Sequence, residues 1–87
     1  MKRLTGILAD IFDVPAEAAG QPRVTVTGGR RLHVENHRGI TGYDPAEVRI
    51  NCPGGTVAVT GRSLRIRAMS SRELVVTGDI RAVEFTG

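Results

Sequence analysis

Thr-Gly pairs recur along this chain of 87 residues, and three of them end near-copies of one pattern. The copies are VTVTG at 24–28, VAVTG at 57–61 and LVVTG at 74–78. Alternating apolar residues put every second side chain on one face of a β-strand. Glycine adopts the positive φ that a tight turn or a bulge needs. The pattern therefore predicts a β protein of short, similar strands, each ended by a turn.

Two further alternating runs, 31–36 and 47–52, have apolar residues on one side and polar residues on the other. The side chains expected to point inward from these runs are Leu32, Val34, Val48 and Ile50. Glycine, proline and serine lie between the runs and predict turns at 28–29, 53–55 and 70–72. Each of the two later Thr-Gly pairs predicts a hairpin of its own, around Gly61-Arg62 and around Gly78-Asp79.

The glycines of successive Thr-Gly pairs lie at 28, 42, 61 and 78, so their spacing is uneven. A solenoid keeps a fixed period over its repeats. We therefore expect an all-β fold: a small antiparallel sheet of short hairpins folded over itself, sandwich-like or a short stack of rungs. Residues 23–87 form this β domain within a single domain, because a chain of this length holds one core.

The N-terminal segment has a different pattern. Its apolar residues recur with the period of an amphipathic helix, and this predicts a helix over residues 1–13, followed by a linker at 14–22 with two prolines. A helix of about ten residues is too short to be stable alone in water. Its apolar stripe must pack on the sheet, on a second subunit or on a membrane surface; it consists of Leu4, Ile7, Leu8, Ile11 and Phe12.

The core is expected to be aliphatic and thin. Only Phe12, Tyr43 and Phe85 are aromatic, and a chain this short buries a modest fraction of its surface. Self-association or a partner is therefore expected to add stability, and a homo-oligomer is one form that this can take.

The net charge is +3, and eleven of the twelve basic residues are arginine. The arginines that alternate with inward residues predict a basic outer face for nucleic acid or an acidic partner; they are Arg31, Arg49, Arg65, Arg67 and Arg81. Surface aromatics for base stacking are not interleaved with them. Cross-strand pairs with glutamates are the simpler explanation, and the expected glutamates are Glu35, Glu47, Glu73 and Glu84. A nucleic-acid-binding module that uses this arginine-rich outer face is therefore kept as the alternative hypothesis.

The densest polar cluster is Glu35-Asn36-His37-Arg38-Gly39. A catalytic interpretation uses Glu35 or His37 as a general base and Arg38 to hold an anion. A structural interpretation makes the cluster a turn in which Asn36 and Gly39 take left-handed geometry and the side chains cap carbonyls. No nucleophile elbow, phosphate loop or paired acids accompany the cluster. The sequence favours a turn or a recognition surface, and no enzyme activity is expected.

Metal, cofactor and disulfide chemistry are not expected. Along an extended strand, His33 and His37 lie about 13 Å apart, which is too far to share an ion. A turn at Asn36 would bring them closer, but Glu35 is then the one further ligand nearby. Cys52 is the single cysteine, so it forms no intrachain disulfide, and without a basic neighbour beyond Arg49 it is expected to be inert. Neither a secretory signal nor a stretch of about 20 apolar residues is present, so a cytoplasmic protein is expected.

The stretch LHVENHRGI at 32–40 resembles a motif of the YabP/YqfC sporulation family. The likeness extends to DVP at 13–15, QPRVTVTGGRRL at 21–32, VRI at 48–50, GRSLRIR at 61–67 and VTGDIRAVEF at 76–85. It covers nearly the whole chain in the same order. At 16–20 the chain departs from the family, with small and polar residues where larger apolar ones are usual.

The resemblance implies a protein of endospore-forming bacteria that is needed to make a proper spore. No enzymatic activity is implied. The implied partner is a membrane sporulation protein that is encoded alongside. We expect a scaffold or adaptor in the cytoplasm of the mother-cell compartment. The residues expected to bind the partner are the stripe Leu4, Ile7, Leu8, Ile11 and Phe12 and the cluster Glu35, Asn36, His37 and Arg38.

Overall fold

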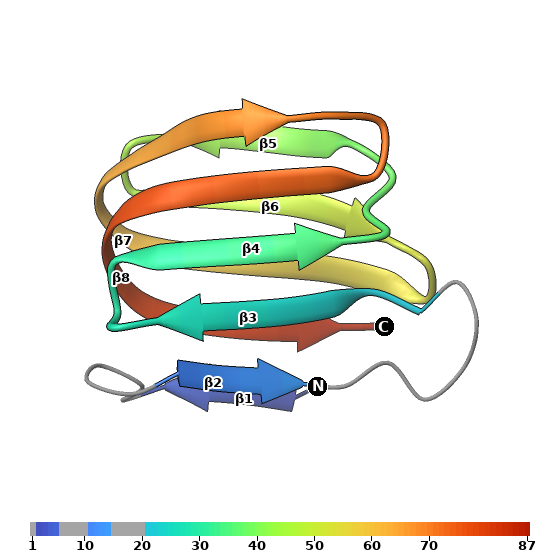
Figure 1. The fold of residues 1–87 in the computed structure, drawn as a ribbon, viewed down its shortest axis with the longest axis horizontal. Coiled ribbons are helices and arrows are strands. Elements are labelled where there is room, and N and C mark those ends of the chain that lie inside the picture. The colour runs from blue at the N-terminus through green and yellow to red at the C-terminus, as the bar shows by residue number, and fades with distance from the viewer. Residues whose placement is uncertain (1, 6–10, 15–20) are drawn as a thin grey trace.

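Eight strands, each antiparallel to its neighbours, form one sheet in a computed structural model that describes residues 2–5, 11–14 and 21–87. The strands are β1 Lys2–Thr5, β2 Ile11–Val14, β3 Arg23–Thr27, β4 Arg31–Glu35, β5 Ile40–Asp44, β6 Glu47–Cys52, β7 Gly55–Met69 and β8 Glu73–Thr86. Their order is β2-β3-β4-β8-β7-β6-β5, and β1 pairs with β8 (Figure 1). The predicted all-β sheet folded over itself is confirmed.

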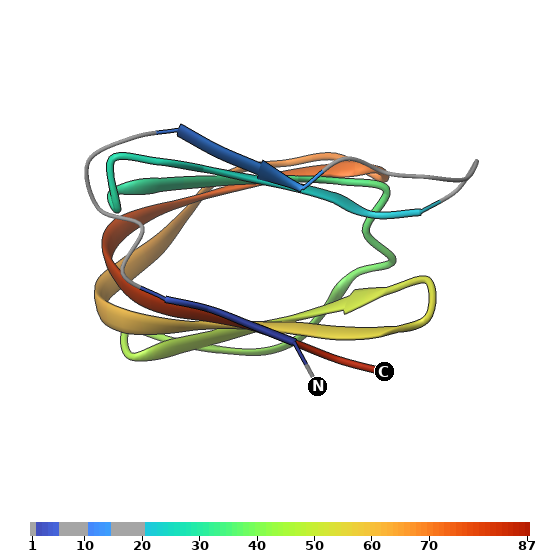
Figure 2. The same cartoon turned by 90° about the horizontal axis from the view of Figure 1, so that it is seen from below.

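The two longest strands, β7 and β8, belong to both layers of the folded sheet (Figure 2). The first layer consists of β2, β3, β4, the start of β8 and the end of β7. The second layer consists of β1, the end of β8, the start of β7, β6 and β5. Curvature of this long hairpin therefore joins the two layers at one end of the sandwich, which we call the bend end.

Glycines allow the bend. The β7–β8 register shifts between Thr60 and Gly61 and again between Arg62 and Arg65. Gly78 has φ 138°, and a Cβ there would lie 2.6 Å from the carbonyl oxygen of Ser63. The prediction of two separate hairpins, at Gly61 and at Gly78, is therefore wrong. Bulges at these positions curve both strands without reversing them, so the strands remain paired on both sides of the bend.

Other turns are found where glycine, proline and serine predict them. At the β3–β4 turn, Gly28 and Gly29 have φ values of 59° and 65°, and the Arg30 N–H donates to the Thr27 carbonyl at 3.1 Å. Gly54, with φ 88°, lies between β6 and β7. Between β7 and β8, the Ser70 hydroxyl accepts from the Glu73 N–H at 2.9 Å. Here the sequence places the reversals of the chain correctly.

The core lies between the two layers and is aliphatic, as the composition predicts. All of the predicted inward residues are buried: Val24, Val26, Leu32, Val34, Val48, Ile50, Val57, Val59, Leu74 and Val76. Phe85 is half-buried and packs against this cluster. Burying each Val, Leu or Ile contributes roughly 1.5–3 kcal/mol relative to leaving it exposed.

The predicted N-terminal helix is not present in the described residues. Lys2–Thr5 and Ile11–Val14 are strands, and residues 6–10 of the predicted helix lie outside the described residues, as do 15–20 of the predicted linker. In the register, Leu4 lies opposite Val83 and Phe12 opposite Val26. A helix this short is marginal in water, whereas a sheet edge offers backbone groups to an extended segment. Edge pairing thus overrides the helical period.

Candidate functional site

The segment between β4 and β5 crosses from the first layer to the second at the end of the sandwich opposite the bend (Figure 2). Two residues in it have positive φ: Asn36 at 66° and Gly39 at 117°. Asparagine tolerates this region better than most residues, and glycine enters it freely. The Asn36 side-chain amide also donates to the Gln21 carbonyl at 2.9 Å. The predicted turn is confirmed, and it serves as the crossing between the layers.

His37 occupies the centre of this crossing. It is 4% exposed, and its Nδ1 accepts a hydrogen bond from the Gly39 N–H at 2.9 Å. Because Nδ1 accepts, the network assigns the ring proton to Nε2. Nε2 lies 2.9 Å from the Ser70 carbonyl oxygen and 3.2 Å from that of Glu73, so it donates to the β7–β8 turn.

Backbone hydrogen bonds tie the same segment to two other elements. The His37 N–H donates to the Arg72 carbonyl at 3.2 Å, in the β7–β8 turn. The Arg38 N–H donates to the Asn51 carbonyl at 2.6 Å, and the Asn51 N–H donates to the Gly39 carbonyl at 2.8 Å. The crossing therefore links β4, the end of β6 and the β7–β8 turn. We call this region the His37 end.

A polar hollow opens beside the His37 end. It is lined by Asn36, His37, Arg38, Pro53, Ser71 and Arg72. Arg38 and Arg72 are exposed, and no carboxylate lines the hollow. Glu35, the remaining member of the predicted site, lies outside it and forms a 3.9 Å ion pair with Arg23 across β3 and β4. Of the predicted cluster, Arg38 is thus the charged residue that lines the hollow.

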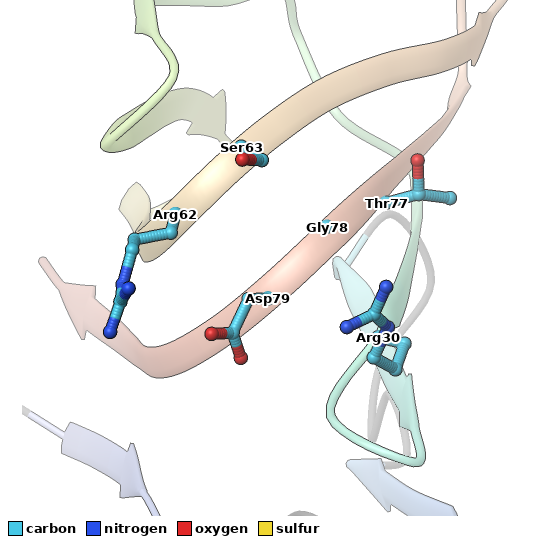
Figure 3. Close-up of a pocket in the computed structure, with 6 residues that line it drawn as sticks. All are labelled: Arg30, Arg62, Ser63, Thr77, Gly78 and Asp79. Atoms are coloured by element: carbon cyan, nitrogen blue, oxygen red, sulfur yellow. The ribbon is translucent and has the colours of Figure 1, made fainter.

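A second hollow lies at the bend end and was not predicted (Figure 3). Arg30 comes from the β3–β4 turn, Arg62 and Ser63 from β7, and Thr77, Gly78 and Asp79 from β8. Ser63 has φ 53°, which is uncommon for a residue with a side chain. The sequence feature that could have indicated this hollow is the pair of Thr-Gly units at 60–61 and 77–78, because they lie where the paired strands bend.

The predicted N-terminal stripe is divided between the layers. Leu4 lies in β1, which pairs with β8, whereas Ile11 and Phe12 lie in β2, which pairs with β3. Ile7 and Leu8 lie outside the described residues. The strands therefore do not bring Leu4 and Phe12 onto one helical face, and the binding role of the stripe stays a prediction.

The arginines predicted to lie outward are exposed, but they do not share one surface. Arg31 and Arg65 flank Thr77 in the first layer, whereas Arg49 lies in the second layer opposite Ala58. The Arg49 guanidinium pairs with Glu47 of its own strand at 3.3 Å. The Nε2 of His33 lies 3.0 Å from Glu73 Oε1 on the neighbouring strand. Among the described residues none of these five arginines forms the predicted cross-strand pair with a glutamate, because Arg49 and Arg81 pair with acids of their own strands. The prediction of cross-strand arginine–glutamate pairs is therefore wrong for these arginines.

Cys52, at the end of β6, is buried. Burial raises the pKa of its thiol from 9.0 to about 11, because desolvation disfavours the thiolate. A thiol with this pKa is a weak nucleophile at neutral pH. In the part of the chain that the structure describes, no group of three or more His, Cys, Asp or Glu side chains is placed to hold a metal ion. No helix among these residues has the length and apolar character to span a membrane.

Comparison with known proteins places the chain near one family. The model of the YabP family matches residues 18–87, which include β3 to β8 and both hollows. The chain is also 27% identical over 84 residues to a protein of Bacillus subtilis (strain 168) described as "Uncharacterized protein YqfC". That alignment covers 95% of this chain and 90% of the Bacillus protein. No solved structure gives a significant match.

Proposed function

Because the chain belongs to the YabP family, we propose that it is a sporulation protein that acts as a non-enzymatic scaffold or adaptor through protein–protein contacts. The family resemblance supplies the link to spore formation. Its partner would be a membrane-associated sporulation protein, and the chain would work in the cytoplasm of the mother cell. The environment of His37 supports the role of a binding platform.

The observation that carries this proposal is the state of His37. A general base needs a free nitrogen within reach of a substrate. The ring of His37 is buried, and both of its nitrogens face backbone groups of the chain itself. The side chain with the greatest catalytic potential is thus used to hold the layers together. This supports a binding protein over an enzyme.

A nucleic-acid-binding module using an arginine-rich outer face is the alternative. Division of the predicted arginines between two layers weakens it, because neither layer collects all five. Among residues 21–87, Tyr43 is the large exposed aromatic residue, and its hydroxyl donates to the Leu64 carbonyl at 2.9 Å. A surface without a row of free aromatic rings lacks the platform on which single strands stack.

The test uses an endospore-forming host from which the gene for this chain has been deleted. We expect the deletion to reduce heat-resistant spores, and a tagged copy of the chain to restore them. Cross-linking and purification of the tagged protein from sporulating cells should recover a membrane sporulation protein. Normal spore counts after the deletion, or recovery of nucleic acid in place of a protein, would contradict the proposal.

A further inference from the structure

The end of β7, Arg65–Met69, is an edge of the first layer. β8 pairs with it on one side, and β6 pairs only with the start of β7, residues 55–60. Among the residues that the structure describes, no strand pairs with its other side. An edge of this kind presents unpaired N–H and C=O groups to which another strand can bond.

The place where this edge begins is well defined. The Leu64 N–H donates to the Pro45 carbonyl at 2.9 Å, and the Leu64 carbonyl accepts from the Tyr43 hydroxyl at 2.9 Å. Both backbone groups of Leu64 are therefore occupied by β5 and the β5–β6 turn. The unpaired edge starts at the next residue, Arg65, and continues to Met69, which is 53% exposed.

Five arginines surround this edge and the bend; we call Arg30, Arg31, Arg62, Arg65 and Arg67 the arginine cluster. Arg31 and Arg65 lie on either side of Thr77 in the register, and Thr77 lines the bend hollow with Arg30 and Arg62. All five are exposed, and within residues 21–87 none forms an ion pair.

Charge elsewhere in the chain is close to balanced. Asp79, the acid in the bend hollow, lies 3.3 Å from Arg81 and is neutralised by it. Outside the arginine cluster, the twelve Lys and Arg leave seven, against nine Asp and Glu. The net charge of +3 therefore comes from the arginine cluster.

We propose that the edge Arg65–Met69 is completed by an extended acidic segment of a protein partner, whose carboxylates pair with the arginine cluster. Strand addition supplies main-chain hydrogen bonds, and side chains at alternate positions supply specificity. Arginine presents a planar fork that fits a carboxylate with two hydrogen bonds. This inference rests on the proposed adaptor function and specifies the chemistry of its partner.

A second copy of the chain fits the edge poorly. Edge-to-edge pairing of two copies would bring Arg65 and Arg67 of one copy close to the same residues of the other, and like charges across strands are destabilising. Single-stranded nucleic acid also fits poorly, because neither the edge Arg65–Met69 nor the described lining of the bend hollow includes an aromatic side chain on which a base can stack. The combination of an unpaired edge and surplus arginine favours an acidic strand.

The test measures binding of a fluorescein-labelled octapeptide of alternating Glu and Thr to the full chain by anisotropy. The comparison peptide replaces each Glu by Lys. At about 50 mM salt, where exposed charges are weakly screened, the Glu peptide should bind and the Lys peptide should not. The double variant Arg65→Glu/Arg67→Glu should weaken binding at least about tenfold, since attraction becomes repulsion. The double variant Arg38→Glu/Arg72→Glu removes the same charge from the β4–β5 crossing and the β7–β8 turn, beyond the end of the edge, so it should weaken binding less than Arg65→Glu/Arg67→Glu.

Strand addition has a second readout that simple charge attraction lacks. In hydrogen exchange followed by mass spectrometry, a peptide covering 65–69 should exchange more slowly when the Glu peptide is bound. Equal binding of the two peptides, or unchanged exchange at 65–69, would overturn the proposal. So would tighter binding to single-stranded DNA or to anionic lipid vesicles that is lost in Arg65→Glu/Arg67→Glu, because it would assign the edge to phosphate.

Failure of this inference differs from failure of the proposed function. If the deletion strain lacks spores and the tagged protein recovers a membrane protein, but the Glu peptide does not bind, only the acidic-strand assignment is lost. If the deletion leaves spore counts normal, the adaptor role is lost whatever the peptide does.

Discussion

The two ends of the sandwich join the layers in different ways. At the His37 end a single chain segment crosses between layers, and a buried imidazole and backbone hydrogen bonds fix it. At the bend end two paired strands curve together, and glycines at 61 and 78 allow the curvature. Chemically versatile side chains serve structure at the first end. At the second end, Thr-Gly units form the bend, and both the unpaired edge Arg65–Met69 and the arginine cluster begin there.

Substitution at the bend should have the largest effect. A Cβ at Gly78 would lie 2.6 Å from the Ser63 carbonyl oxygen, and the φ of 138° disfavours any side chain. We expect Gly78→Ala to lower the free energy of unfolding by about 3 kcal/mol or more, through strain and steric overlap. Urea denaturation measures this.

Gly39→Ala is the matched control for the bend. Gly39 also has a positive φ, 117°, but a Cβ there would meet nothing within 4 Å. It should therefore cost only the backbone strain, on the order of 1–2 kcal/mol. Equal losses for the two variants would show that close packing at the bend is not what requires glycine.

Removal of the imidazole should have the next largest effect. His37→Ala deletes the acceptor for Gly39 N–H and the donor to the Ser70 carbonyl. Leaving these partly buried groups unsatisfied should cost roughly 2–3 kcal/mol of unfolding free energy. His33→Ala, which removes an exposed contact to Glu73, should cost less than about 1 kcal/mol. A loss at His37 no greater than that at His33 would refute its structural role.

Cys52, next to Asn51 in the His37 end, provides an alkaline test. Its pKa is about 11 in the folded protein against 9.0 for a free cysteine thiol, so folding favours the protonated form. The corresponding stability is fully present below pH 9 and is lost as pH rises through 11. Relative to Cys52→Ala, the parent should lose roughly 2 kcal/mol over this window in urea denaturation. The same loss in both proteins would remove the assignment to Cys52.

Charge reversal at the exposed edge should change stability least. Arg65→Glu/Arg67→Glu replaces two solvent-exposed side chains, so the free energy of unfolding should change by less than about 1 kcal/mol. Thermal unfolding followed by circular dichroism would check this. A cooperative transition near that of the parent is the expected outcome, and a large decrease in Tm would mean that these arginines stabilise the fold.

Sequence patterns predict the strands and the core well because alternation reports directly on the two faces of a strand. Leu32, Val34, Val48 and Ile50 are buried as the alternation requires. The bend was missed because Thr27-Gly28 ends a strand whereas Thr60-Gly61 lies within one, although the local sequence is the same. Which of the two occurs depends on pairing with β8, and a local pattern does not contain that pairing.

The predictions for the N-terminal segment and for the polar cluster were incomplete for different reasons. Leu4 and Phe12 fit a helical period, but both lie in strands, where they are opposite Val83 and Val26 in the register. For the cluster, the turn at Asn36 and Gly39 follows from residue type. Burial of His37 could not be predicted from the sequence, since it depends on Ser70 and Glu73, which lie 33 and 36 residues further along the chain.

The most direct test compares the edge Arg65–Met69 with the His37 end in sporulating cells. The deletion strain is complemented with Arg65→Glu/Arg67→Glu or with Arg38→Glu/Arg72→Glu at equal protein levels, and heat-resistant spores are counted. If the edge Arg65–Met69 binds the partner, the first variant should fail to restore spores and the second should restore them. Full restoration by the first variant together with failure of the second would contradict this account and place the functional surface at the His37 end.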